Sequence, residues 1–115
     1  MRTYRFRVLN VFAQTTLGGN PLAVFENGQG LSDAEMQALA LQFNLSETTF
    51  ILPATAPGAN ARVRIFTPTF EMPFAGHPTL GTAHVVRALG LGDHVLNLEM
   101  KAGLIPVTGI NGDSD

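Results

Sequence analysis

The segment from Phe70 to His84 constrains the fold most, because it joins a tight turn to a strongly apolar helix. Pro78 suits the first helical position, where its missing N–H has no partner to lose and its φ angle is already helical. Between Pro78 and Leu89 the only formal charge is Arg87, and apolar residues point in nearly every direction. Because a helix that is apolar all round is a core helix, we expect a buried helix over Pro78–Leu89, ended by the glycine that follows.

The turn before this helix predicts an anion-binding site. Gly76 lets the backbone come close to a ligand that lies above the turn. The N–H groups at the start of a helix attract anions, carboxylates included. The alternative is a plain core helix that begins with a proline and binds nothing, but the anion pocket is the interpretation that we favour.

Length and composition indicate a single domain over residues 1–115. The 115 residues are 45% hydrophobic and 14% charged, which is enough to bury a core. The net charge is −2, and the arginines at positions 2, 5 and 7 alternate with apolar residues, as on the outward face of a strand. Nucleic-acid binding therefore has little support.

Several further classes are disfavoured. No apolar run approaches the ~20 residues of a membrane span, and the N-terminus lacks the layout of a signal peptide. Without cysteine there is no disulfide framework or thiol chemistry, so we expect a cytoplasmic protein without membrane contact. His77 and His84 are seven residues apart rather than the three or four that suit two metal ligands, so we expect no metal site and interpret His84 as a packed helix residue.

The remaining periodicity predicts six strands and a second helix. The strands cover Tyr4–Phe12, Pro21–Phe25, Leu45–Leu52, Ala61–Thr67, His94–Met100 and Leu104–Ile110. A capping box at Ser32 and Glu35 predicts the start of the second helix, and Asn44 in a left-handed conformation predicts its end. This order favours an α+β fold, in which a curved mixed β-sheet wraps around the central buried helix.

Glu47, Glu71 and His77 are the candidates for proton transfer. A carboxylate partly stripped of water has a raised pKa and exchanges a proton near neutrality, and a histidine does so with little tuning. If the strand that holds Glu47 begins opposite the turn at Gly76, then Glu47 and His77 flank one small cavity. The alternative for Glu47 is an exposed or ion-paired strand end, and Glu71 is interpreted as turn surface. Asn20, beside a tight turn, suits either that turn or a ligand.

Three motifs of this chain resemble those of the PhzF family, the phenazine-biosynthesis isomerases and their relatives. They comprise Gly19–Val24, Asn44–Phe50, and Arg64–Pro68 continued by Phe74–Ala83. The resemblance implies one half of a diaminopimelate-epimerase-like fold, in which two similar halves each wrap a sheet around a central helix and the active site lies between them. It also implies a cofactor-free isomerase that moves a proton on a small carboxylic acid of the dihydro-hydroxyanthranilate type.

The same resemblance assigns roles to individual residues. Glu47 matches the general acid/base of the family, and His77 matches the histidine beside it. Asn20, Ser46 and Gly76 match positions that contact the substrate. The lack of cysteine is consistent with this branch, because the amino-acid epimerases of the same fold use a pair of thiols.

The chain departs from the family in two respects. Asn10 stands where many relatives carry an aspartate. The family chain is also about twice as long, and its second half brings another acid and a second glycine-rich helix start. We therefore expect the N-terminal half of an isomerase, partnered by the missing second lobe or by a second copy in a homodimer. The alternatives are a non-catalytic module that binds small carboxylates and a structural half that pairs with itself.

Overall fold

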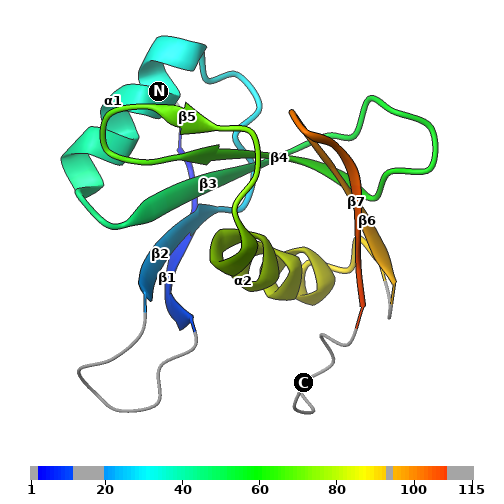
Figure 1. The fold of residues 1–115 in the computed structure, drawn as a ribbon. Helices are drawn as coiled ribbons and strands as arrows, with labels where there is room; N and C mark the ends of the chain where they lie inside the picture. The colour runs from blue at the N-terminus through cyan, green and yellow to red at the C-terminus, as the bar shows by residue number, and fades with distance from the viewer. Residues whose placement is uncertain (1–2, 12–19, 93–94, 109–115) are drawn as a thin grey trace.

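The computed structural model describes residues 3–11, 20–92 and 95–108, and within them the chain has a mixed α+β fold of seven strands and two helices (Figure 1). The elements, in chain order, are β1 (Phe6–Val11), β2 (Asn20–Phe25), α1 (Asp33–Phe43), β3 (Glu47–Leu52), β4 (Ala61–Phe66), β5 (Glu71–Met72), α2 (Gly76–Ala88), β6 (Leu96–Met100) and β7 (Gly103–Val107). The predicted α+β class is confirmed, and all six predicted strands are found where the structure describes them.

The strands form one mixed sheet in the order β1-β2-β3-β4-β6-β7. β2 runs parallel to β3 and β4 runs parallel to β6, whereas the other neighbours are antiparallel. The start of β4 pairs with β6, and its end pairs with the short strand β5. The sequence analysis missed β5, because a strand of two residues is too short to show an alternating pattern.

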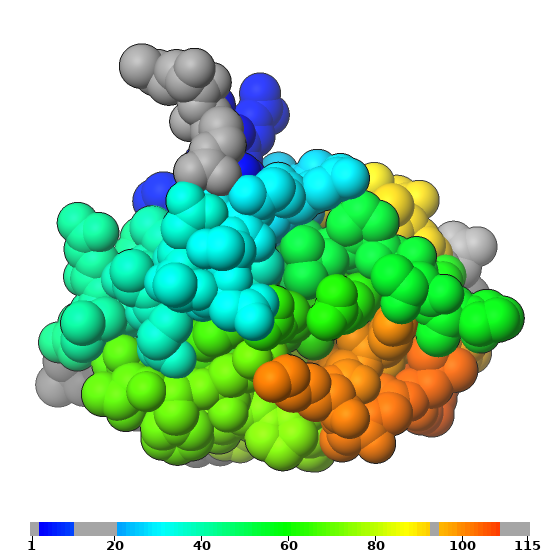
Figure 2. All heavy atoms as spheres, turned by 90° about the horizontal axis from the view of Figure 1, so that it is seen from above, coloured from blue at the N-terminus to red at the C-terminus, as the bar shows by residue number. Residues whose placement is uncertain are grey.

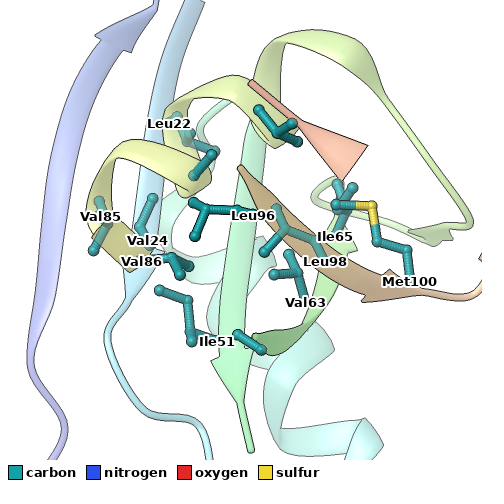
Figure 3. Close-up of a cluster of buried hydrophobic side chains, with 13 residues drawn as sticks. Leu22, Val24, Ile51, Val63, Ile65, Val85, Val86, Leu96, Leu98 and Met100 are labelled. Atoms are coloured by element: carbon teal, nitrogen blue, oxygen red, sulfur yellow. The ribbon is translucent and has the colours of Figure 1, made fainter. Parts of the chain in front are cut away.

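The two helices cover opposite faces of the sheet, since successive strand residues alternate between two hydrophobic clusters. The larger cluster lies between the sheet and α2 (Figure 3) and contains Leu22, Val24, Ile51, Ala61, Val63, Ile65, Ala83, Val85, Val86, Leu96, Leu98, Met100 and Val107. The smaller cluster lies under α1 and contains Phe25, Met36, Ala40, Phe50 and Phe66. The larger cluster holds α2 against β1, β2, β3, β4 and β6.

Helix α2 differs from its prediction in two details. It begins at Gly76, two residues earlier than expected, so that Pro78 is the third helical residue rather than the first. Its buried residues include Thr82, Val85 and Val86, but His84 is exposed. The interpretation of His84 as a packed residue was therefore wrong, because α2 keeps one side open to solvent.

Helix α1 has the predicted ends. Ser32 Oγ accepts a hydrogen bond from the Glu35 N–H at 3.1 Å, and Glu35 Oε1 accepts one from the Ser32 N–H at 2.8 Å. Asn44 has a left-handed conformation with φ 54° and ψ 37°, as expected for a residue that ends a helix. Among the residues that the structure describes, no helix is long and apolar enough to cross a membrane.

Candidate active site at the starts of β3 and α2

Glu47 is the first residue of β3 and is half-buried. The parallel register pairs it with Leu22 of β2, whose side chain packs in the cluster under α2. Paired residues on neighbouring strands share a face of the sheet, so Glu47 lies on the face that carries α2. Two residues further along β3, the buried hydroxyls of Thr49 and Thr82 share a hydrogen bond of 2.7 Å. This bond fastens the start of β3 to α2.

The structure brings Glu47 close to His77, the second residue of α2. Burial raises the pKa of the Glu47 carboxyl, and the positive charge of His77 opposes this rise. This electrostatic interaction shows that the His77 ring lies within electrostatic range of the Glu47 carboxyl. A partly buried carboxylate with a raised pKa, beside a histidine, is an arrangement suited to proton transfer. Their catalytic roles stay predictions.

The start of α2 is suited to an anion. Ala75 precedes the helix in an extended conformation, and no side chain caps the helix start among the described residues. Thr79 satisfies the Ala75 carbonyl by donating its N–H at 3.2 Å and its Oγ1 hydroxyl at 2.6 Å. A Cβ atom built at Gly76 would meet no described atom within 4 Å. The described part of the protein therefore gives no steric reason for a glycine at this position.

A shallow hollow of about 290 Å³ lies directly beside this helix start. Its lining residues are Phe74, Gly76, Thr79, Leu80, Ile105, Pro106, Val107 and Thr108. Most of these side chains are apolar, and β7 forms one wall. An apolar wall next to a helix N-terminus suits a ligand that combines a carboxylate with a hydrocarbon ring.

The structure describes the other predicted site residues, Asn20 and Ser46, in less detail. Ser46 immediately precedes β3 and is exposed. The backbone of Asn20 begins β2 and pairs with Val11, but its side chain lies outside the described residues, as does the turn at Gly18 and Gly19. Because β2 and β3 are parallel, Asn20 and Glu47 both stand where their strands begin, at one edge of the sheet.

Glu71 is not the turn surface that the sequence analysis expected. It lies half-buried in β5 and accepts hydrogen bonds from Arg64 Nη2 at 2.7 Å and Arg64 Nε at 2.8 Å. Burial acts to raise the pKa of Glu71, but the hydrogen bonds from Arg64 and Lys101 outweigh it and lower the pKa. Glu71 is thus held ionised, which is unsuited to proton exchange near neutrality. Over the described residues, no group of three or more His, Asp or Glu side chains could hold a metal ion.

Comparison with known proteins gives concordant matches. The family model of phenazine biosynthesis-like proteins (PhzC-PhzF) matches residues 9–115. An uncharacterized isomerase of Pasteurella multocida is 52% identical over 103 residues, which are 89% of this chain and 35% of the relative. The trans-2,3-dihydro-3-hydroxyanthranilate isomerase of Pseudomonas aeruginosa is 47% identical over 103 residues, which are 90% of this chain and 36% of that protein.

A solved structure also resembles the fold. The crystal structure of a phenazine biosynthesis protein of the PhzF family from Bacillus anthracis has a TM-score of 0.82 and 34% sequence identity, over 98% of this chain and 38% of that one. The present chain thus spans little more than a third of the length of the relatives that it matches. These relatives are more than twice as long as this chain, whereas the sequence predicted a family chain of about twice its length.

Proposed function

Because the chain belongs to the family of phenazine biosynthesis-like proteins (PhzC-PhzF), we propose that it forms the N-terminal lobe of a cofactor-free isomerase. In this proposal Glu47 moves a proton on a small carboxylic acid, and His77 acts beside it. The observation that carries the proposal is the pairing of a partly buried carboxylate with a histidine at an uncapped helix start. Relatives named as isomerases support the reaction class.

The proposed reaction needs only a base, an acid and an anion site. The carboxylate of Glu47 takes a proton from a carbon, and the electron pair moves into the conjugated system next to the substrate's acid group. A proton then returns to a different carbon, which leaves the atoms balanced and the double bonds shifted. A substrate carboxylate at the start of α2 adds negative charge near Glu47 and excludes water, and both effects make Glu47 a stronger base.

The hollow beside Gly76 supports a proposal for the class of substrate. We propose a ring acid of the dihydro-hydroxyanthranilate type, with its carboxylate at the start of α2 and its ring against Leu80 and Ile105. Asn20 and Ser46 complete the contacts at the edge of the sheet. The name of the Pseudomonas aeruginosa relative supports this class.

We propose that the sheet wraps around α2 as one lobe of a two-lobed, diaminopimelate-epimerase-like protein, with the site in the cleft between the lobes. In this proposal the protein is cytoplasmic. The second lobe comes from the rest of a longer chain or from a second copy of this chain in a homodimer. Large apolar side chains that are exposed in this chain support a covered face. They are Phe6, Val8, Leu41, Phe70, Phe74, Leu91, Val95 and Leu104.

The decisive experiment follows solvent deuterium into trans-2,3-dihydro-3-hydroxyanthranilate with a protein that carries both lobes. Glu47→Gln should fold normally and incorporate deuterium about a hundredfold or more slowly, the range expected when a general base is removed. Full exchange by this variant would exclude Glu47 as the proton-transfer residue. His84→Gln, on the exposed side of α2, is the matched control and should exchange at the normal rate.

The main alternative is a non-catalytic module for small carboxylates, with the ligand held at the uncapped start of α2. The 115-residue chain would then bind anthranilate, seen as amide shifts from Gly76 to Thr79, without exchanging deuterium. Sedimentation separates the remaining possibilities. A stable monomer at micromolar concentration would refute self-pairing, and turnover by that monomer would refute the need for a second lobe.

A further inference from the structure

Four charged side chains form one network around Arg64 of β4. Arg64 holds Glu71 with two hydrogen bonds and Asp33 with a third at 2.6 Å. Lys101 Nζ adds a contact of 2.9 Å to Glu71 Oε1. The side chains of Arg64 and Glu71 are only 10% and 12% exposed. Because a bidentate pair of this kind is both strong and directional, it fixes the position of Glu71 closely.

This network joins β4 and β5 to two segments that are distant from them in the sequence. Arg64 belongs to β4, Glu71 to β5 and Asp33 to the first turn of α1, and Lys101 stands in the turn between β6 and β7. The Arg64 guanidinium also lies 5.4 Å from the centre of the Phe66 ring. The network thus ties the segment that leads into α2 to the rest of the sheet.

The end of β6 and the turn that follows it make two further contacts on either side of the start of α2. The Ala102 N–H donates to the Pro73 carbonyl at 3.3 Å. The Thr79 hydroxyl lies 3.8 Å from Met100 Sδ. In Figure 2 the orange start of β7 lies against the yellow-green segment that leads into α2. Residues 100–102 therefore contact the chain both before and after the point where α2 begins.

We propose that Glu71, held by Arg64 and Lys101, is a positioning residue that sets where Gly76 and His77 stand relative to Glu47. This inference rests on the proposed function. It assigns the network a role in positioning the site, in addition to any contribution to the stability of the fold. Glu71 is six residues before His77, and the short connection between β5 and α2 is held by the hydrogen bond from Ala102 to Pro73. We therefore expect a shift at Glu71 to reach the first turn of α2.

Two variants test the inference at different strengths. Lys101→Met removes the contact made by a side chain that is 53% exposed and leaves the Arg64–Glu71 pair in place, so the variant should fold. Glu71→Gln keeps the shape of the side chain but removes its charge. The matched control is Glu26→Gln, which breaks a 2.7 Å ion pair between Glu26, just after β2, and Arg7 of β1.

The experiment records, by NMR of the whole chain, the titration of the His77 ring and the shifts of the Gly76–Thr79 amides with added anthranilate. We expect both network variants to move the His77 titration and to weaken anthranilate binding about tenfold, since small misplacements of a binding group cost up to about a hundredfold. Glu26→Gln should leave both signals unchanged.

The inference is overturned if Lys101→Met and Glu71→Gln lower the melting temperature but keep the wild-type His77 titration and anthranilate affinity. That outcome would reduce the network to a structural role. Failure of the proposed function is distinguishable. If the wild-type chain does not bind anthranilate, the carboxylate site proposed at the start of α2 is absent from this lobe alone, whereas the His77 titration still decides whether the network positions the helix start.

Discussion

The two ends of α2 differ in how closely the rest of the fold surrounds them. At its start, Gly76 has open space where a Cβ atom would project. Beyond its end, a Cβ atom at Gly92 would lie 2.2 Å from Leu96 Cδ2 and 2.9 Å from Asn60 Nδ2. Gly90 has a φ angle of 80°, which favours glycine for conformational reasons. The glycines after α2 are thus required by the fold, whereas the glycine at its start is not.

The hydrogen bonds show the same difference. Asn60 fixes the far end by donating from Nδ2 to the Leu91 carbonyl at 3.0 Å and by accepting from the Asn97 N–H at 2.8 Å. The start of α2 has no side-chain cap among the described residues. A helix end that is left uncapped beside a hollow gives up stability that capping would add. We interpret the far end as structural and the start as reserved for a ligand.

The largest expected effect is on the structural end. Gly92→Ala should lower the free energy of unfolding by about 1–3 kcal/mol, the usual cost of overpacking a filled site. Both obstructing atoms end side chains, but Leu96 is fully buried and the Asn60 amide is held by hydrogen bonds, so neither yields easily. Urea denaturation measures the loss. A Gly92→Ala protein as stable as the wild type would remove the contrast between the two ends.

Asn60 offers a second, smaller test of the same end. Asn60→Ala should cost about 1–2 kcal/mol, because it removes two hydrogen bonds that join the end of α2 to β6. Asn60→Asp keeps the acceptor for the Asn97 N–H and should cost less. Neither change should alter anthranilate affinity, which titration calorimetry can follow. Equal losses in affinity and stability would mean that the two ends are coupled.

The sequence predicted the structural features that depend on local chemistry. The caps of α1 at Ser32 and Asn44 follow from side chains that bond to nearby backbone. That Glu47 and His77 lie beside each other was implied by the resemblance to the PhzF family, and the strand pattern alone did not predict it. What the sequence could not predict depends on distant partners. Glu71 lies in an ion-pair network only because β5 folds back on Arg64 of β4.

A substitution at the start of α2 should change the affinity for the ligand rather than the free energy of unfolding. Gly76→Ala should change the free energy of unfolding by less than about 0.5 kcal/mol, because the added methyl meets no described atom. The same methyl should weaken anthranilate binding about tenfold, which corresponds to about 1.4 kcal/mol. His84→Ala, on the open side of α2, is the control and should keep full affinity. Unchanged affinity in Gly76→Ala would contradict a ligand at this helix start.

The smallest expected effect concerns the pH dependence of the two glutamates. Burial raises the folded-state pKa of Glu47, so its stabilising contribution is present below its unfolded pKa and is lost as pH rises through the folded value. The pKa of Glu71 is lowered although burial opposes this, because Arg64 and Lys101 hold the charged form. Its contribution is therefore present above the unfolded pKa and lost as pH falls through the folded value.

The two substitutions should accordingly have opposite signs near neutrality. Glu47→Gln should equal or exceed the wild type in stability at pH 7, by less than about 1 kcal/mol because the carboxyl is partly solvated. That advantage should vanish as pH falls below the folded pKa of Glu47. Glu71→Gln should instead be destabilised at pH 7 and approach the wild type only in acid. Urea denaturation from pH 3 to pH 8 gives both curves. Parallel curves would mean that the carboxylate at the site and the carboxylate in the network serve the fold alike.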